Sequence, residues 1–275
     1  MTELPTSIGV YGGGRMGAGI AHAFAVSGAH VMVIENDDPA AAAARERIEK
    51  SIAKAAEKGI PATGTVTVTT DPAALTAAGL VIEAVPELAD LKRTVLATIA
   101  SAAPAAAIGT NTSSLSIDNL ADAVPDPGRV IGLHFFNPVP VSDLVEIVVG
   151  ARTDQTLVTL AAEWVAALGK TAITVTDSPG FASSRLGVAI ALEAMRMLDE
   201  GVASAHDIDT AMTLGYRHPV GPLKTTDIVG LDVRLNIAEH LERELGARFA
   251  PPKVLRDKVA AGHLGRKTGQ GFYTW

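Results

Sequence analysis

The chain has 275 residues, of which 48% are hydrophobic and 19% charged, so it can bury the core of one large domain or two moderate ones. Its formal net charge of -7 argues against a general nucleic-acid-binding protein. The absence of cysteine excludes disulfides and thiolate metal sites and suits a reducing cytoplasm, and no other metal site is predicted. The opening stretch "MTELPTSIGV" lacks the features of a signal peptide, and no run of about 18 apolar residues predicts a membrane span.

The first 110 residues or so alternate between predicted strands and predicted helices. The strands are apolar with little alternation, as expected when both faces of a sheet are covered. Strand, helix and strand at this spacing indicate βαβ units and a parallel sheet. Strands are predicted at 7–12, 30–35, 65–70, 80–85 and 106–113, and helices at 15–28, 38–58, 71–79 and 88–103.

The pattern changes after residue 128. The apolar stretches 129–136 and 144–149 are joined by a short connection with two prolines, which favours an antiparallel strand pair. A helix at 153–168 and a strand at 171–177 follow. The turn "DSPG" at 177–180 is the predicted domain boundary.

The remainder of the chain, 181–275, is predicted to be helical. Its first helix, 181–201, is apolar nearly all the way round as far as Glu193, so we expect it to be buried on most faces. The stretch "SAHD" at 204–207 resembles a capping box that opens the next helix.

The stretch "GGGRMG" at 12–17 contains the G-x-G-x-x-G pattern after a predicted strand and at the start of a helix. In a dinucleotide-binding fold, the first glycine allows the tight turn, the second allows backbone to approach a pyrophosphate, and the third allows the helix to lie close to the sheet. A P-loop would require lysine where Ala18 stands. The predicted cofactor contacts in this loop are Gly12, Gly14, Arg15, Met16 and Gly17.

Glu35 ends the second strand, 18 residues after Gly17. A carboxylate at this place accepts hydrogen bonds from the adenosine ribose hydroxyls. The next three residues, 36–38, are Asn-Asp-Asp and include no arginine, so the sequence predicts NAD rather than NADP. The alternative interpretation is a glycine-rich turn that binds no ligand.

The stretch "GLHFFNPVPVSDLVEIV" at 132–148 places one histidine and one glutamate around a proline-containing turn. If the strands pair about Pro140, His134 faces Glu146, with Cβ atoms about 4.5–5.5 Å apart. A histidine oriented by a carboxylate can take the hydroxyl proton during alcohol oxidation. The alternative is a half-buried histidine satisfied by its cross-strand partner.

The stretch "NTSSLS" at 111–116 ends the fifth predicted strand. Ligands of open α/β sheets bind at the carboxyl ends of strands, so Ser113 or Ser114 could donate to a substrate oxygen. Equally, either serine could cap a helix that begins near Leu115. The sequence leaves both interpretations open.

The chain resembles the L-3-hydroxyacyl-CoA dehydrogenases, including the bacterial 3-hydroxybutyryl-CoA dehydrogenases. The resemblance rests on the stretches above and on "VIEAVPE", "DSPGF", "DIDTAM", "GPLKTTDIVGLD" and "GRKTGQGFY". The matches come in order and cover nearly the whole chain. The resemblance implies reversible oxidation of an L-3-hydroxyacyl-CoA by NAD. It implies an α/β fold, with a Rossmann-like domain at 1–180 whose mostly parallel sheet carries added antiparallel strands. An all-α domain at 181–275 follows, and the site would lie between the two domains.

The resemblance also implies roles for single residues. His134 would be the general base and Glu146 its carboxylate partner, while Ser113 would contact both the C3 oxygen of the substrate and the nicotinamide side. Ser51 and Lys58 fall where the family contacts coenzyme A. The other implied cofactor contacts are Glu87, Lys92, Asn137 and Lys267.

Three lysines also suggest a coenzyme A site on physical grounds. Lys50, Lys54 and Lys58 are spaced to share one face of the predicted helix, and a basic stripe on an acidic protein suits a polyphosphate. The alternative is a solvated surface face in which Glu46 pairs with Lys50.

Two stretches depart from the family. Ser184, in "PGFASSR", stands where the family usually has an asparagine that orients the substrate. The stretch "EKGIPATGTVTVTT" at 57–70 is short where relatives usually have a longer helical tail, which could alter how the coenzyme A end is held.

The sequence therefore predicts a cytoplasmic, NAD-dependent dehydrogenase that is a homodimer through its helical domain, with an acyl-CoA substrate and no nucleic-acid or membrane partner. One alternative is a dehydrogenase of a free hydroxy acid or sugar acid on the same scaffold, against which the basic helix face argues. Another is a non-catalytic NAD-binding or structural protein, against which the set of Ser113, His134 and Glu146 argues.

Overall fold

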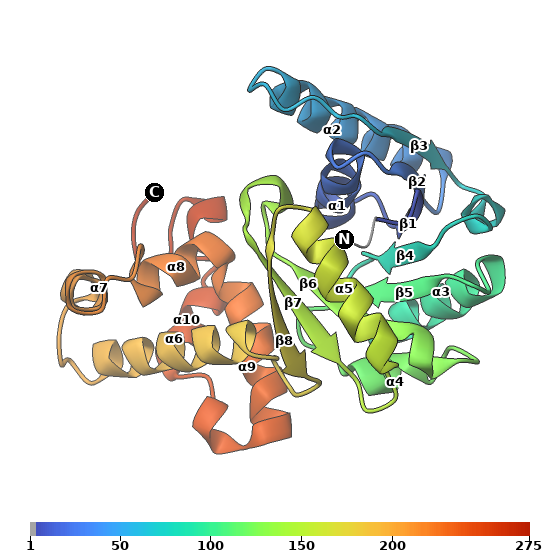
Figure 1. The fold of residues 1–275 in the computed structure, drawn as a ribbon. Coiled ribbons are helices and arrows are strands. Elements are labelled where there is room, and N and C mark those ends of the chain that lie inside the picture. Colours follow the sequence, from blue (N-terminus) through green and yellow to red (C-terminus); the bar gives the residue numbers. More distant parts are fainter. Residues whose placement is uncertain (1–3) are drawn as a thin grey trace. The chain divides into compact units, whose positions relative to one another are not determined.

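The computed structural model describes residues 4–275, and the chain divides into two compact units (Figure 1). The first unit ends at Ser178 and the second runs from Pro179 to Trp275. The first three residues of the predicted first domain lie outside the described residues.

The first unit contains an eight-stranded sheet with helices on both faces. Its strands are β1 (Ser7–Tyr11), β2 (His30–Ile34), β3 (Thr65–Thr69), β4 (Leu80–Glu83), β5 (Ala107–Thr110), β6 (Val130–Phe135), β7 (Leu144–Val149) and β8 (Thr171–Thr176). Its helices are α1 (Arg15–Val26), α2 (Asp38–Ala56), α3 (Ala89–Ala102), α4 (Ile117–Ala121) and α5 (Gln155–Ala167), and short 3₁₀ turns occur at Pro72–Leu75, Pro127–Arg129 and Val139–Val141.

The strand order of the sheet is β3-β2-β1-β4-β5-β6-β7-β8. Strands β1 to β6 are parallel, β7 pairs antiparallel with β6, and β8 pairs parallel with β7. This confirms the predicted α/β class with antiparallel strands added to a parallel sheet. In the β6–β7 pair, His134 lies opposite Glu146, so the predicted register is confirmed.

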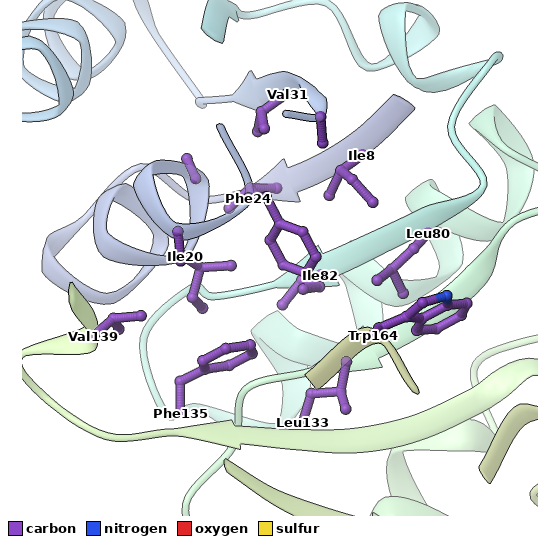
Figure 2. Close-up of a cluster of buried hydrophobic side chains, with 14 of the residues drawn as sticks. Ile8, Ile20, Phe24, Val31, Leu80, Ile82, Leu133, Phe135, Val139 and Trp164 are labelled. Atoms are coloured by element: carbon purple, nitrogen blue, oxygen red, sulfur yellow. The ribbon is translucent and has the colours of Figure 1, made fainter. Parts of the chain in front are cut away.

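The core of this unit explains why its strands are apolar without alternation. On one face, strand side chains pack against α1 and α5, as Figure 2 shows for Ile8, Leu80, Ile82, Leu133, Phe24 and Trp164. On the other face, α3 packs against β4 and β5, and Leu96 and Ile99 of α3 are fully buried. Each fully buried Leu or Ile stabilises the fold by about 1.5–3 kcal/mol relative to exposure.

Three predicted elements of this unit are shorter than the sequence suggested. Helix α2 ends at Ala56 because Gly59, with φ of +79°, turns the chain, so Lys58 lies beyond the helix. Strand β5 stops at Thr110. In the loop that follows, backbone N–H groups bond to side chains, as the N–H of Leu115 does to Oγ1 of Thr112. The helix predicted at 71–79 is only the 3₁₀ turn Pro72–Leu75.

The second unit is helical, as predicted. The helix α7 begins as the capping box required, since the N–H of Asp207 donates to Oγ of Ser204 at 3.1 Å. The elements are α6 (Ser183–Asp199), α7 (Ala205–Thr210), a π turn (Ala211–Gly215), α8 (Pro222–Val229), α9 (Leu231–Leu245), α10 (Lys253–Ala260) and 3₁₀ turns at Ala247–Phe249 and Arg266–Thr268.

Helix α6 differs from its prediction. One face is buried through residues such as Val188, Leu192 and Met195. The other face is open, because Leu186 is 63% exposed and Ile190 is 37% exposed. The prediction of burial on most faces is wrong for the single chain, because apolar composition alone does not say which residues find a partner within it.

The C-terminal tail of the second unit is anchored by a buried carboxylate. Asp227 of α8 is 1% exposed and accepts hydrogen bonds from the N–H groups of Phe272 and Tyr273 and from the indole of Trp275. A buried carboxylate needs such donors, since leaving it without them would cost several kcal/mol. The tail and α8 are therefore held as one structure.

Across residues 4–275, no helix combines the length and apolarity required to cross a membrane.

Candidate active site

The glycine loop, Glu35, the serine loop and the His134–Glu146 pair of the first unit all lie where strands meet one edge of its sheet. The parallel strands β1, β2, β4, β5 and β6 all end there, and β7 begins there. Ligands of open α/β sheets bind at this carboxyl edge.

The glycine loop after β1 has the backbone that a dinucleotide requires. Gly12 has φ of +95°, and a Cβ on Gly17 would lie 1.7 Å from the oxygen of Gly12, so α1 approaches the strand as closely as predicted. A Cβ on Gly14 would meet no heavy atom within 4 Å. Helix α1 begins just after Gly14, and its first N–H groups suit an anion.

Glu35 supports this loop as well as facing it. The N–H of Gly13 donates to Oε1 of Glu35 at 2.6 Å. Among the described residues, Oε2 of Glu35 has no hydrogen-bond partner. One oxygen therefore fixes the loop, and the other is the atom that suits a ribose hydroxyl.

The imidazole of His134 is held by Glu146. Its Nδ1 lies 2.7 Å from Oε2 of Glu146, and the side chains are 10% and 0% exposed. The ring of Phe136 lies 4.5 Å from the imidazole, centroid to centroid. Because a carboxylate only accepts hydrogen bonds, Nδ1 is the donor in this pair and Nε2 becomes the basic nitrogen.

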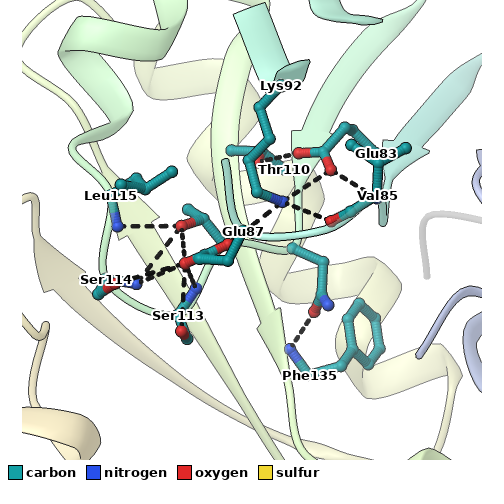
Figure 3. Close-up of polar contacts among 11 residues, drawn as sticks. Glu83, Val85, Glu87, Lys92, Thr110, Ser113, Ser114, Leu115 and Phe135 are labelled. Atoms are coloured by element: carbon teal, nitrogen blue, oxygen red, sulfur yellow. Dashed lines mark hydrogen bonds and ion pairs between the residues drawn. The ribbon is translucent and has the colours of Figure 1, made fainter. Parts of the chain in front are cut away.

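The "NTSS" loop after β5 is organised around Glu87 (Figure 3). Oε1 of Glu87 accepts hydrogen bonds from Oγ1 of Thr112 at 2.6 Å and from the N–H and Oγ of Ser113 at 2.8 and 3.1 Å. It also accepts from the N–H and Oγ of Ser114 at 3.2 and 3.4 Å. One carboxylate oxygen thus gathers the hydroxyl groups and amides of this loop.

The charge on Glu87 is stabilised by its surroundings. Burial alone would raise the pKa of Glu87, but the ammonium of Lys92 and the hydrogen bonds from Thr112 and Ser113 outweigh burial and lower it. The side chain is therefore a carboxylate at neutral pH.

Lys92 is itself completely buried, with 1% exposure. Its Nζ lies 2.7 Å from Oε1 of Glu83, 3.1 Å from the oxygen of Val85 and 3.3 Å from Oε2 of Glu87. The ammonium therefore makes two hydrogen bonds, to Glu83 and Val85, and an ion pair with Glu87. Glu83 is equally buried, and its Oε2 accepts from Oγ1 of Thr110 at 2.6 Å.

The capping alternative for the serine loop is wrong. The N-cap of α4 is Ser116, whose Oγ accepts from the N–H of Asn119. Ser113 and Ser114 point their hydroxyl groups at Glu87 instead.

The serine loop and the histidine strand are also joined directly. Oδ1 of Asn111 accepts from the N–H of Phe135 at 2.9 Å, beside His134 in the chain. Asn137 follows on the same segment, where it is exposed at its cis bond to Pro138.

The predicted coenzyme A residues lie on or after α2. Oγ of Ser51 is 3.1 Å from Nδ1 of His22 on α1, and burial together with the charge of Lys170 lowers the pKa of His22. Lys50 pairs with Glu46, so that part of the basic stripe behaves as the solvated alternative predicted.

Lys54 and Lys58 differ from Lys50. All three lysines are exposed, but neither Lys54 nor Lys58 has a side-chain hydrogen bond or ion pair within residues 4–275. The described contacts therefore separate the two lysines from the paired Lys50.

Two expected residues lie in the second unit. Nζ of Lys267 is 2.6 Å from both carboxylate oxygens of Asp232. Burial alone would raise the pKa of Asp232, but the hydrogen bond and charge of Lys267 outweigh burial, so the pKa is lowered. Ser184 is in the first turn of α6 and is half-buried.

Sequence reasoning missed several residues that shape this edge. The sequence did give a signal for Glu83, because it is a charged residue in the apolar strand "LVIE" and a charge in a buried strand needs a partner. Arg47 donates to the oxygen of Gly13, 34 residues away, and His22 contacts Ser51, 29 residues away. No local pattern predicts such distant contacts.

Comparisons with known proteins bear directly on this arrangement. Residues 7–178 match the family model described as 3-hydroxyacyl-CoA dehydrogenase, NAD binding domain, and residues 180–275 match that of the C-terminal domain. The chain belongs to the 3-hydroxyacyl-CoA dehydrogenase family. The predicted family is thereby confirmed, and the protein is an NAD-dependent 3-hydroxyacyl-CoA dehydrogenase.

Members of the 3-hydroxyacyl-CoA dehydrogenase family match over nearly the whole of this chain. The chain is 40% identical to a 3-hydroxybutyryl-CoA dehydrogenase of Mycobacterium tuberculosis over 100% of both chains. It is 36% identical to the mitochondrial hydroxyacyl-coenzyme A dehydrogenase of Sus scrofa, over 99% of this chain and 92% of the other. The solved (S)-3-hydroxybutyryl-CoA dehydrogenase PaaH1 of Ralstonia eutropha superposes with a TM-score of 0.92 at 38% identity, over 99% of each chain.

The glycine loop fits the cofactor of this family. The open approach at Gly14, the N-terminus of α1 and the second oxygen of Glu35 suit the pyrophosphate and adenosine ribose of NAD.

Proposed function

We propose that this dehydrogenase interconverts 3-hydroxybutyryl-CoA and acetoacetyl-CoA, with His134 as the general base. The observation that supports this most strongly is the 2.7 Å hydrogen bond from His134 to the fully buried Glu146 at the carboxyl edge of the sheet. The short acyl chain is proposed because relatives at 38–40% identity are named for 3-hydroxybutyryl-CoA.

The proton is handled by His134 and Glu146. Nε2 of His134 takes the hydroxyl proton of the substrate as the C3–H bond breaks. Glu146 holds the ring through Nδ1 and stabilises the positive imidazolium that results. NAD, when bound, accepts the hydride that leaves C3.

Ser113 is proposed to bind the reacting oxygen. Its hydroxyl group lies in the loop gathered by Glu87, and a rotation about one bond would let it donate to a substrate oxygen instead of Glu87. Asn111 ties this loop to the strand of His134, so the two groups that address the C3 oxygen have a shared support.

The remaining contacts are proposed from the family pattern and the geometry together. Glu35 binds the adenosine ribose, while Gly12, Gly14, Arg15, Met16 and Gly17 surround the pyrophosphate. Ser51, Lys54 and Lys58 hold the phosphates of coenzyme A. Glu87, Asn137 and Lys267 complete the proposed cofactor contacts. Lys92 is buried, so it acts on the cofactor through Glu87 and not by direct contact as the family pattern implied.

The test is a turnover assay of His134→Ala with acetoacetyl-CoA, which follows the loss of NADH absorbance. Removal of a positioned base should lower kcat by about 10²–10⁴-fold. Circular dichroism and NADH binding should match the wild type, which shows that the fold is kept. Turnover within threefold of the wild type would reject His134 as the base.

The second part of the proposal is a homodimer formed through the helical unit. Large apolar side chains of this unit stay exposed in the single chain: Leu186, Ile190, Val202, Leu214, Tyr216, Ile228, Val229 and Val233. Exposed apolar side chains gathered on one unit are typical of a surface that another chain covers. The cytoplasmic location inferred from the sequence stays a prediction.

A further inference from the structure

Helix α2 packs directly against the glycine loop. A Cβ added to Gly13 would lie 2.5 Å from Cβ of Ala44, so the helix touches the loop at this point. One turn further along α2, Arg47 extends back to the loop. Its Nη1 donates a hydrogen bond of 2.8 Å to the carbonyl oxygen of Gly13.

Gly13 is consequently held at both of its backbone groups. Its N–H donates to Oε1 of Glu35 at 2.6 Å, and its oxygen accepts from Arg47. A trans peptide is planar, so its oxygen and the following N–H point in opposite directions. A donor fixed on the oxygen of Gly13 therefore also fixes the direction of the N–H of Gly14.

The N–H of Gly14 is one of the groups at the start of α1 that are ready for a ligand. Among the described residues, no acceptor bonds to it, and the space beside its Cα is open. Gly14 is the N-cap of α1, where the helix dipole favours an anion. A cation bonded to the oxygen of the same peptide polarises it and strengthens its N–H as a donor.

The interaction of Arg47 is distinct from that of its neighbour. Arg45, two residues earlier on the same helix, donates to the oxygen of Val68 on β3 at 3.2 Å and does not bond to the loop. Arg47 forms no ion pair with a carboxylate within residues 4–275, so its charge is not neutralised by one there. The chain thus offers two arginines on one helix, of which one bonds to the glycine loop.

We propose that Arg47 is a positioning residue for NAD: it holds the Gly13–Gly14 peptide so that the N–H of Gly14 points at the pyrophosphate. Arg47 acts through the loop and does not touch the reacting atoms. Its removal should weaken the binding of every ligand that presents the ADP-ribose part of NAD. The hydride step and the binding of acyl-CoA should not depend on it.

The experiment compares the wild type with Arg47→Ala, Arg47→Lys and the matched control Arg45→Ala. Dissociation constants for NADH and ADP-ribose come from fluorescence titration and calorimetry, and steady-state kinetics give kcat and KM for NAD and acetoacetyl-CoA. Arg47→Ala should raise both dissociation constants and the KM for NAD by about tenfold, the scale of one charge-assisted hydrogen bond. The kcat at saturating cofactor should fall by less than about twofold.

The conservative variant and the control make the result specific. Arg47→Lys keeps one cationic donor for one carbonyl, so it should recover at least half of the lost affinity on a logarithmic scale. Arg45→Ala removes the same charge from the same helix and should stay within about twofold of the wild type.

Three outcomes would overturn the proposal. Unchanged ADP-ribose binding in Arg47→Ala is the first. Equal losses in Arg45→Ala would show a general charge effect, and a rise in the KM for acetoacetyl-CoA alone would assign Arg47 to the substrate. The binding of ADP-ribose by the wild type is measured in the same series. A wild type that does not bind ADP-ribose would show that the cofactor site, and not only the role of Arg47, is wrongly assigned.

Discussion

Lys92 shows how much of this site depends on groups that a ligand cannot reach. Its ammonium is buried between Glu83 and Glu87, where it makes two hydrogen bonds and an ion pair within the protein. Its effect on the cofactor is therefore expected to pass through Glu87, whose carboxylate gathers the loop of Ser113.

Replacing Lys92 by methionine tests this role. The variant leaves two carboxylates near one another without a cation, and breaking such a buried pair costs about 3–5 kcal/mol. We expect the free energy of unfolding, measured by urea denaturation at pH 7, to fall by that amount. The double variant Lys92→Met with Glu83→Gln should recover part of the loss, because it removes one of the uncompensated charges.

A loss below about 1 kcal/mol in the single variant would contradict the buried ion pair. Recovery by Glu83→Gln separates an electrostatic cause from a simple packing defect, since the second substitution changes charge with little change in shape. Urea denaturation in the presence of NADH would show whether the wild type, the double variant and the single variant also rank in this order for cofactor binding.

At the scale of elements, α2 serves both proposed ligands of the enzyme. Its middle contacts the glycine loop through Ala44 and Arg47, and its last turns present Ser51 and Lys54. Lys50, which pairs with Glu46, lies between Arg47 and Ser51 in the sequence and is a matched control for the unpaired Lys54 and Lys58.

Replacing both Lys54 and Lys58 by alanine should raise the KM for acetoacetyl-CoA by about three- to tenfold at low salt, since two phosphate contacts are lost. The KM for NAD should not change. Because exposed charges are screened, the difference should shrink when the ionic strength is raised. Kinetics at two salt concentrations measure this, and an equal rise in Lys50→Ala would contradict a specific site.

The elements that sequence predicts well are those that depend on local pattern. The sheet was predictable because its strands are short apolar runs between helices, and the contact of His134 with Glu146 was predictable because a short turn fixes the register of two adjacent strands. The end of α2 and the exposed face of α6 were not, since they depend on a left-handed glycine and on which side chains find a packing partner within the chain.

The site was predictable to the same extent. The residues of the glycine loop and the histidine strand follow from motifs, whereas the five donors that converge on Glu87 come from a loop about 26 residues away. Arg47 reaches Gly13 across a helix–loop contact that no spacing rule describes.

For the whole molecule, the exposed apolar face of α6 predicts how the chain associates. Leu186→Glu places a charge in the proposed interface and should convert a dimer to a monomer, because burying an unpaired charge is costly. Light scattering after size-exclusion chromatography measures the mass. The control Ile60→Glu changes a similarly exposed apolar residue, 52% exposed, in the first unit and should leave the mass unchanged.

A monomeric wild type, or a dimer that survives in Leu186→Glu, would contradict this surface. The comparison should be made at several protein concentrations, because the mass of a dissociating dimer depends on concentration.

The chain has two tryptophans, and each unit contains one of them. Trp164 of α5 is 5% exposed in the core of the first unit, while Trp275 is 41% exposed and bonded to Asp227 in the second. The enzyme therefore has a native fluorophore on either side of residue 178. Phenylalanine in place of one indole at a time would let melting of the nucleotide-binding half and of the helical half be recorded separately, without any attached dye.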